Sequence, residues 1–582
     1  MEKLFRGNFM KTGYPSIDKT HLKKISYFKR NPLIPNLSVS NVFDLVSLGY
    51  RDEEAIDCLD LHIKYKDLIK DSSILEKAFL ELGVKKGDII SICMPNIYQA
   101  VVSYFALNKI GAVTTFLNSF SAKEEIVYHL NEFSSPIFIN YDKDQEYNNF
   151  IKKNTSVKQI ITLKKENLNN NRFNCDKVSG YNDFVDFNDL KGVSEYYKGF
   201  YNVIGKGKDD ALILFTSGTT GVPKAVVLTN KNILASCIYL KNSSNTKPIK
   251  GEGSLVCVPF TYPYGFATST LTSLLCGRKV ILCPDLSKEN VSYYLSKRPN
   301  IIFGSPAMLE MVKRNVLPNQ DLSSVHTFIS GGDFLTPQKN IEGQEFFKKH
   351  NANTVICNGS GNAETVGAGT NSVGIEQNFD TVGKILDGSD AVIMNDDYTK
   401  ELKYGEEGLL CVSGSNVFKE YYGKPFETLM SKFCYNKKIY FKTGTRGILY
   451  EDGYFKLTGR DSRYYIMSTL NKVYCDRVQL LMSYIDEIDD VAFVQKPDDD
   501  LLFVGVAYVV LKNKYKESDE MKKIIFEKCK NVLISPNGEQ EQLKENEIPV
   551  EIVFVPELPK TKADKINYEP LLEDAKKLVL KK

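Results

Sequence analysis

Short apolar runs alternate with amphipathic stretches in residues 61–140, which is the pattern of strands that alternate with helices. The helical spacing that begins near Lys66 stops at Gly83, a residue that commonly ends helices. Strands and helices in alternation build a mostly parallel sheet with helices on both faces. We therefore expect an α/β fold with doubly wound sheets. The predicted elements are a helix over 66–82, a strand over 88–92, a helix over 100–109 and a strand over 112–115.

The same alternation returns in the middle of the chain, and its character changes towards the end. Short strands and Gly-rich turns over 382–457 predict an antiparallel sheet or a small barrel-like subdomain. Residues 461–582 read as a small α+β segment, whereas the Asn- and Lys-rich residues 145–205 predict an irregular insertion or surface hairpin. The further strands are predicted at 211–215, 254–259, 279–283, 301–304, 327–330, 491–495 and 503–511.

A chain of 582 residues exceeds the size at which one hydrophobic core keeps growing, so we expect more than one domain. The changes in pattern divide it into a polar lead-in over 1–45, a large domain over 46–459 and a small C-terminal domain over 460–582.

Composition narrows the class of protein. The net charge of +3 is spread along the chain, which argues against a nucleic-acid surface. Twelve cysteines without a CxxC pair make disulfides and zinc sites unexpected. The start lacks the apolar core of a signal peptide, and the most apolar stretch, 100–117, is interrupted by Asn108 and Lys109. We expect a cytoplasmic protein without a transmembrane segment.

The most specific candidate site is the run from Thr216 to Ala225, TSGTTGVPKA, which follows the predicted strand 211–215. Glycines let backbone N–H groups approach an anion, hydroxyl groups add donors, and Lys224 supplies a positive charge suited to phosphate. It is no Walker loop, because Lys224 follows Pro223 rather than Gly. A cluster of this composition is often an ordinary turn, but the whole run predicts a phosphate-binding loop.

This run resembles the AMP-binding signature of the adenylate-forming superfamily, which includes acyl-CoA synthetases, coumarate-CoA ligases, peptide-synthetase adenylation domains and firefly luciferase. The resemblance extends over nearly the whole chain, through strings such as 82–88, 95–96 and 106–112. It implies a large domain in which ATP binds at this run, and a small mobile domain that follows the large one in the chain. The residues expected to hold the ATP phosphates are Thr216, Ser217, Gly218, Thr219, Thr220, Gly221 and Lys224.

Four later segments carry the rest of the implied site. Gly331 and Gly332 resemble a Gly-rich strand end beside adenine and the acyl pocket, although a plain turn is an equal alternative. Glu364, in the run NGSGNAE with Ser360 and Gly361, is implied to hold Mg²⁺ against the phosphates. The resemblance also gives Arg460 contacts to ribose or phosphate, and it makes Lys565 the catalytic lysine.

Several positions depart from the family pattern. Ser360 replaces a tyrosine that stacks on adenine, and Thr445 replaces an aspartate that accepts the ribose hydroxyls. Losing both contacts lowers the ATP affinity by about two to four kcal/mol, or roughly thirty- to a thousand-fold. The other departures are Tyr262 for a histidine, Ala363 for a threonine, Ser462 at the hinge, Asp564 for a glycine, and the sequence 468–473 in place of a Gly-rich loop.

The implied function is the activation of a fatty or aromatic carboxylic acid with Mg-ATP, followed by transfer of the acyl group to CoA. Aromatic residues within 258–266 are as compatible with core packing as with an acyl pocket. Two alternatives stay open: an adenylating enzyme that loads a carrier protein, and a non-catalytic family member that binds a nucleotide or acyl ligand. The second alternative is motivated by the departures at Tyr262, Ser360, Ala363, Thr445 and Asp564.

Overall fold

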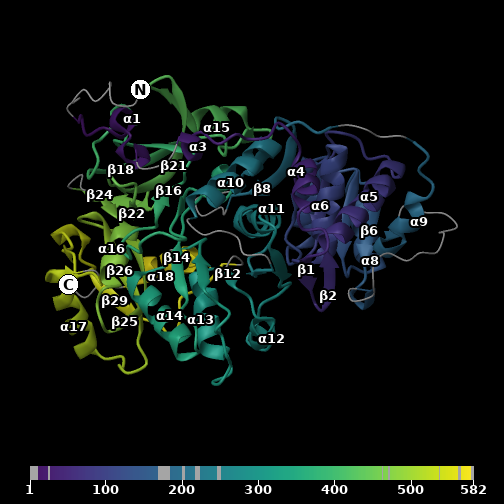
Figure 1. Ribbon diagram of the computed structural model, residues 1–582. Coiled ribbons are helices and arrows are strands. Elements are labelled where there is room, and N and C mark those ends of the chain that lie inside the picture. Colours follow the sequence, from purple (N-terminus) through teal and green to yellow (C-terminus); the bar gives the residue numbers. More distant parts are fainter. Residues whose placement is uncertain are drawn as a thin grey trace.

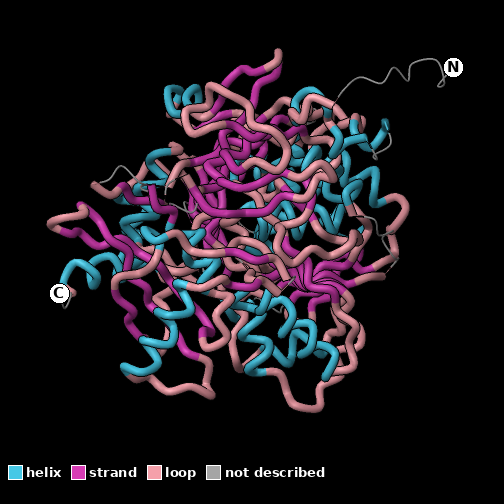
Figure 2. The backbone as a smooth tube through the Cα atoms, turned by 90° about the vertical axis from the view of Figure 1, so that its left-hand side faces the viewer, coloured by secondary structure: helices cyan, strands magenta, loops and turns pink. Residues whose placement is uncertain are grey.

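The computed structural model describes residues 11–23, 27–167, 184–199, 204–216, 223–244, 251–333, 335–461, 463–468, 472–536, 538–561 and 565–578. These residues form a large α/β domain and a smaller α+β domain, as the sequence predicts (Figure 1). Strands concentrate in the interior and helices lie mostly towards the outside (Figure 2).

The first sheet of the large domain has eight strands, in the order β19-β9-β8-β4-β3-β5-β6-β7. The six strands from β8 to β7 run parallel, β9 pairs antiparallel with β8, and β19 pairs antiparallel with β9. The strands are β3 (Ile89–Cys93), β4 (Val113–Phe116), β5 (Ile137–Tyr141), β6 (Gln159–Leu163), β7 (Phe184–Asp186), β8 (Asp210–Phe215), β9 (Ala225–Thr229) and β19 (Glu420–Tyr421).

The prediction of an irregular insertion over 145–205 is wrong in part. Residues 145–154 form helix α8 (Gln145–Asn154), and β6 and β7 extend the parallel sheet. The buried residues Ile160, Ile161 and Leu163 provide the apolar contacts of β6, which the many Asn and Lys residues around them concealed. Helix α9 (Leu190–Ser194) follows and packs on α5 (Tyr65–Glu81).

The second sheet has seven strands, in the order β14-β13-β12-β10-β11-β1-β2, and all but the edge strand β2 run parallel. Because these strands are parallel, their carboxyl ends meet at one edge, where α/β proteins commonly bind ligands. The strands are β1 (Glu54–Cys58), β2 (Leu61–Lys64), β10 (Gly253–Val256), β11 (Lys279–Leu282), β12 (Ile301–Gly304), β13 (Thr327–Ser330) and β14 (Val355–Asn358).

Helix α6 (Tyr98–Ile110) is buried on nearly all sides, which explains its almost continuous apolar sequence. It packs against α4 (Val39–Ser47) and α5 in the main hydrophobic core. No helix in the described ranges combines the length and apolar character that crossing a bilayer requires. The other helices of the large domain are α1 (Pro15–Asp18), α2 (Thr20–Lys23), α3 (Tyr27–Arg30), α7 (Lys123–Glu132), α10 (Asn230–Ser243), the π-helix η3 (Tyr264–Leu271), α11 (Thr272–Leu275), α12 (Val291–Ser296), α13 (Pro306–Asn315), α14 (Pro337–Lys349) and α15 (Pro425–Met430).

The antiparallel region predicted over 382–457 is a five-stranded sheet. Its central strand, β21, pairs with β18, β20 and β22, and β17 pairs with β18 at the edge. Its last strand ends at Arg460. The strands are β17 (Asp390–Met394), β18 (Glu407–Ser413), β20 (Lys432–Tyr435), β21 (Lys438–Leu449) and β22 (Phe455–Arg460), and a separate two-stranded ribbon contains β15 (Thr370–Asn371) and β16 (Lys384–Ile385).

The small domain follows β22 and has hydrophobic clusters of its own, built on both faces of the sheet β25-β26-β29. The predicted boundaries after residues 45 and 459 stay predictions; α4 runs across the first of them. The elements are β23 (Tyr464–Ile466), β24 (Lys472–Tyr474), α16 (Cys475–Met482), β25 (Ile488–Asp498), β26 (Leu502–Leu511), α17 (Asp519–Lys530), β27 (Leu533–Ile534), β28 (Gln540–Glu541), β29 (Glu551–Phe554) and α18 (Tyr568–Lys577).

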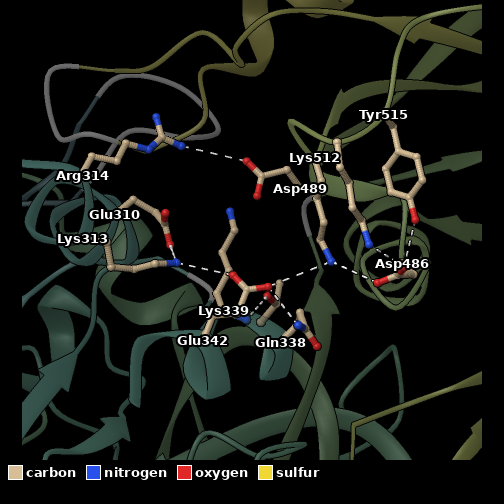
Figure 3. A network of polar contacts seen from close by, with 12 residues as sticks. Glu310, Lys313, Arg314, Gln338, Lys339, Glu342, Asp486, Asp489, Lys512 and Tyr515 are labelled. Carbon is tan, nitrogen blue, oxygen red and sulfur yellow. Dashed lines mark hydrogen bonds and ion pairs between the residues drawn. The ribbon is translucent and has the colours of Figure 1, made fainter. Parts of the chain in front are cut away.

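Ion pairs join the two domains along α13 and α14 (Figure 3). Lys339 Nζ lies 3.2 Å from Asp490 Oδ2, and Arg314 Nη2 lies 4.0 Å from Asp489 Oδ2. Burial alone would lower the pKa of Lys339, but Asp490, Asp489 and Glu310 hold that pKa above its ordinary value. The described hydrophobic clusters of the two domains share no residue, and these ion pairs are part of the contact between them.

Candidate active site

A cleft of about 2010 Å³ lies between the two domains, at the carboxyl ends of the parallel strands. It brings together predicted residues that are as far apart in the chain as Thr216 and Lys565. Ser217, Gly218, Thr219, Thr220 and Gly221 lie outside the described residues. The predicted residues that line the cleft are Thr216, Lys224, Gly331, Gly332, Ser360, Gly361, Glu364, Thr445, Arg460 and Lys565.

Thr216 and Lys224 close the neck of the predicted phosphate loop. The loop joins the antiparallel strands β8 and β9, and the pair of residues next to the loop is Phe215 with Ala225. The backbone N–H of Thr216 donates to the Lys224 carbonyl at 3.0 Å, and the Lys224 N–H donates to Thr216 Oγ1 at 2.9 Å. Thr216 therefore has a structural role at the neck besides any contact to phosphate.

Glu364 lies in the short 3₁₀-helix η4 (Ala363–Thr365) and is buried. The Tyr421 hydroxyl donates to Glu364 Oε1 at 2.6 Å, and Lys224 Nζ lies 4.9 Å from the centre of the Tyr421 ring. Burial raises the pKa of Glu364, while the Tyr421 hydrogen bond and the Lys224 charge act in the opposite direction. Tyr421 was not predicted, because it lies in the run Glu420-Tyr421-Tyr422, which matches no recognisable motif.

Lys565 reaches the cleft from the small domain. Its N–H donates to Thr561 Oγ1 at 3.3 Å, and the Thr561 N–H donates to the Lys565 carbonyl at 2.7 Å, so these contacts hold Lys565 beside Thr561. Burial, with a smaller contribution from the Arg460 charge, lowers the pKa of Lys565 to about 8, and the Asp333 charge acts in the opposite direction. The structure thus brings Lys565, Arg460 and Asp333 together from three distant segments.

Two glycines in the cleft are required by their neighbours. A Cβ atom at Gly361 would lie 2.4 Å from the Gly367 carbonyl oxygen, closer than side-chain atoms approach a backbone. A Cβ at Gly331 would lie 3.1 Å from the Tyr264 ring. Ser360 is held by its N–H, which donates to Thr370 Oγ1 at 2.9 Å. Both glycines are therefore explained by close packing within the wall of the cleft.

Thr445 on β21 pairs with Arg460 on β22, so both side chains project from the same face of the sheet. The Thr445 N–H donates to Thr443 Oγ1 at 3.1 Å. A residue at 445 is therefore well placed to act together with Arg460. A threonine there offers one hydroxyl, where an aspartate would offer two charged acceptors.

The other departures fall partly inside the cleft. Tyr262 and Ala363 line it, whereas Ser462, Asp564 and residues 469–471 lie outside the described part. In the segment 258–266 both sequence interpretations hold: Tyr262 and Tyr264 line the cleft, and Phe266 packs in the core against Tyr104 at 4.8 Å between ring centres.

Glu364 has the chemistry of a Mg²⁺ ligand. Mg²⁺ in nucleotide sites is commonly held by one or two carboxylates and completed by phosphate oxygens and water. Within the described ranges, no group of three or more His, Cys, Asp and Glu side chains is arranged to hold a metal ion by itself. A single buried carboxylate next to the phosphate loop fits an ion that arrives with its nucleotide.

A large α/β domain with this loop, and a small domain that adds a lysine to the same cleft, define a two-domain nucleotide-binding protein. The chain belongs to the AMP-binding enzyme family: the family model for the AMP-binding enzyme matches residues 45–422. The model for the AMP-binding enzyme C-terminal domain matches residues 481–565.

Similar proteins agree with this assignment. A long-chain-fatty-acid–CoA ligase of Bacillus subtilis is 24% identical over 565 residues, covering 93% of this chain and 95% of the relative. 4-Coumarate–CoA ligase 3 of Arabidopsis thaliana is 25% identical over 446 residues, 74% of each chain. Among solved structures, the anthranilate CoA ligase AuaEII in complex with anthranoyl-AMP has a TM-score of 0.78 at 18% identity, with 94% of this chain and 98% of that chain covered. ATP-bound MatB from Rhodopseudomonas palustris has a TM-score of 0.76 at 20% identity, with coverage of 92% and 99%.

Proposed function

We propose that this protein is an AMP-forming acid–CoA ligase, which activates a fatty or aromatic carboxylic acid with ATP and transfers the acyl group to CoA. One observation carries the proposal: a single cleft holds the neck of the phosphate loop, Glu364 and Lys565. Family membership and the CoA ligases among the relatives support it. The cytoplasmic location expected from the sequence stays a prediction.

In the first half-reaction, a carboxylate oxygen of the acid attacks the α-phosphorus of ATP, and the bond from that phosphorus to pyrophosphate breaks. The substrate itself is the nucleophile, so the protein contributes positioning and electrostatic stabilisation. Lys565 and Arg460 lie close enough for their charges to interact, and they would stabilise the negative charge that develops on the transferring phosphoryl group.

The phosphate side of the cleft has a complementary role. Lys224 and the loop that begins after Thr216 would hold the β- and γ-phosphates, and Glu364 would hold Mg²⁺ against them. Mg²⁺ supplies charge neutralisation on these phosphates when it is bound. The hydrogen bond from Tyr421 fixes one Glu364 oxygen, and the carboxylate would offer its other oxygen to Mg²⁺.

In the second half-reaction, the CoA thiol attacks the acyl carbon of the adenylate, the bond from that carbon to the phosphate oxygen breaks, and AMP leaves. The small domain, which is joined to the large one after Arg460, would move between the two steps. The ion pairs between the domains can break and form again during such a motion. A carrier-protein thiol is the alternative acceptor.

Exchange of labelled pyrophosphate into ATP tests the first half-reaction across a panel of carboxylic acids. Acid-dependent exchange, followed by a CoA thioester, is the expected result. Exchange without a thioester would favour loading of a carrier protein. No exchange with any acid, at ATP concentrations high enough to offset the changes at Ser360 and Thr445, would favour a non-catalytic family member.

A further inference from the structure

The cleft extends well beyond the residues that would hold ATP, because it reaches both edges of the second sheet. At the carboxyl edge it contacts Ser305 and Gly331, which directly follow β12 and β13. At the opposite edge it contacts Glu252, Arg278 and His326, which directly precede β10, β11 and β13. The five residue steps from His326 to Gly331 cover about 16 Å at the usual rise of a strand. A channel of that length therefore runs along the strands.

One wall of this channel is the face of the sheet. Ile301 and Phe303 on β12, and Thr327 and Ile329 on β13, line the cleft. Alternate residues of a strand point to the same face, so these four side chains form one surface. Three of the four are apolar.

The opposite wall is a stripe on the consecutive helices η3 and α11. Tyr264, Thr268, Thr272 and Cys276 line the cleft and follow one another at intervals of four residues. The Thr268 hydroxyl donates to the Val366 carbonyl at 2.9 Å, and the Thr272 hydroxyl lies 3.2 Å from the carbonyl oxygen of Ala267. Because backbone carbonyls engage these hydroxyls, the stripe offers methyl groups to the channel, and both walls suit an alkyl chain.

Tyr264 sits where the channel meets the ATP region. Its hydroxyl donates to the Ile329 carbonyl at 2.6 Å, which fixes the ring across the gap between helix and sheet. The same ring lies beside Gly331. A side chain anchored in this position narrows the entrance, which favours an unbranched chain.

The far end of the channel is charged. Arg278 Nε donates to Glu252 Oε2 at 2.9 Å, and His326 Nε2 lies 3.2 Å from Glu252 Oε1. Glu252 is buried, whereas the His326 side chain is 46% exposed. A terminal methyl group would remove water from this ion pair without replacing its hydrogen bonds, and a second carboxylate would face Glu252. A hydroxyl group can accept from Arg278 and donate to Glu252.

We propose that the acid activated by this protein is an unbranched aliphatic acid with a hydroxyl group at its far end. An extended chain covers about 3.5 Å for every three bonds, so about 16 Å corresponds to about 14 chain atoms. This proposal rests on the ligase function proposed above, and it adds Arg278 and Glu252 as residues that select the substrate.

The test is pyrophosphate exchange with three matched series of acids, ending in a methyl, a hydroxyl or a second carboxyl group, at short and full (about 14-atom) length. We expect kcat/KM for the full-length hydroxy acid to exceed that of its methyl- and carboxyl-terminated counterparts by about tenfold, the value of one good hydrogen bond. If the hydroxy acid reacted no better than its methyl- or carboxyl-terminated counterparts, the assignment of Arg278 and Glu252 would be wrong. Exchange with aromatic or short acids only would overturn the whole inference and leave the ligase function standing, whereas no exchange with any acid would overturn both.

Two variants locate the effect. Cys276→Phe places a ring inside the channel and should lower kcat/KM for the full-length acids by at least about tenfold, while the short acids keep their rates and show that the protein is folded. Cys276→Ser, which is close in size, is the matched control. The double variant Arg278→Met with Glu252→Gln removes both charges together and should abolish the preference for the hydroxyl group. If Cys276→Phe kept the wild-type preference for full-length over short acids, the proposed channel would be wrong.

Discussion

The Tyr421 hydroxyl donates a hydrogen bond to Glu364 Oε1 at 2.6 Å, and the ring of the same tyrosine lies 4.9 Å from Lys224 Nζ. Tyr421 thus links the carboxylate proposed to hold Mg²⁺ with the lysine proposed to hold phosphate. It belongs to the edge strand β19 and pairs there with Val226 on β9, the strand that follows the phosphate loop, so the sheet places this tyrosine beside the loop.

Replacing Tyr421 with phenylalanine should raise the pKa of Glu364. Burial already raises this pKa, and the variant removes a hydrogen bond that opposes the effect. A hydrogen bond to a carboxylate is worth about 1.5–3 kcal/mol, so its loss should have a measurable effect on this pKa. If ionised Glu364 binds Mg²⁺, the acidic limb of kcat/KM for pyrophosphate exchange moves to higher pH. An unchanged limb, with normal folding by circular dichroism, would argue against a role for Glu364 in metal binding.

Loss of the Lys565 proton should limit the first half-reaction at alkaline pH. With a pKa of about 8, the side chain is charged below that pH and becomes neutral as the pH rises through it. The exchange rate should therefore fall above about pH 8. Lys565→Ala should reduce the rate by about a hundred- to a thousand-fold and remove this limb, whereas Lys565→Arg stays charged and keeps its rate to higher pH. An alkaline limb that persists in Lys565→Ala belongs to another group.

The burial of Lys565 should also affect the stability of the fold. The pKa of Lys565 is lower in the folded protein than the ordinary lysine value, so the unfolded chain binds this proton more tightly. The cost to folding is fully present below about pH 8 and disappears as the pH rises towards about 10.5. Lys565→Met should thus be more stable to urea than the wild type at neutral pH, and the difference should shrink over that range. A constant difference would show that the charge is solvated.

Thr445→Asp should strengthen ATP binding. Thr445 pairs with Arg460 across β21 and β22, so a carboxylate there projects beside the guanidinium and offers two acceptors to ribose hydroxyls. A gain of about 1.5 kcal/mol lowers the Kd for ATP by roughly tenfold in calorimetry. Thr445→Asn, which has the same shape without the charge, is the control. Equal affinities for the aspartate and asparagine variants would mean that the ribose lies elsewhere.

Lys339 should position Lys565 by holding the small domain against α14. It lies 3.2 Å from Asp490 across the domain contact, and Lys313, on the neighbouring helix α13, pairs with Glu310 and Glu342 inside the large domain. We expect Lys339→Met to slow exchange several-fold and to weaken its dependence on salt, because ionic strength screens such pairs. Lys313→Met should have little effect. Identical salt profiles for the two variants would exclude the role of Lys339.

The sequence predicted the parallel sheets well because their strands carry the clearest patterns. The strands expected at 301–304 and 327–330 occur at those residues, and helix 66–82 is shifted by one residue. The failure at 145–205 has a compositional cause. Strand β6 is short and is surrounded by Asn and Lys, so its apolar residues did not stand out until the neighbouring strand β5 was in place.

The candidate site could be predicted only where a residue belongs to a recognisable run. Lys224, Glu364 and Lys565 were each found in this way, and all three line one cleft. Tyr421 and Arg278 lie in segments without a motif, and their importance comes from neighbours 57 and 26 residues away in the chain, Glu364 and Glu252. Such relationships arise from tertiary packing, which a linear pattern does not contain.

The pair of hydrogen bonds between Thr216 and Lys224 affects what ATP binding demands of the chain. Bringing the two ends of a loop together reduces chain entropy, and in this protein the pairing of β8 with β9 holds Thr216 and Lys224 together. The entropic cost of joining these two ends therefore falls on folding rather than on ATP binding. Changes in the loop that preserve Thr216 and the Lys224 backbone contacts should alter selectivity for the nucleotide without loosening the sheet that carries the loop.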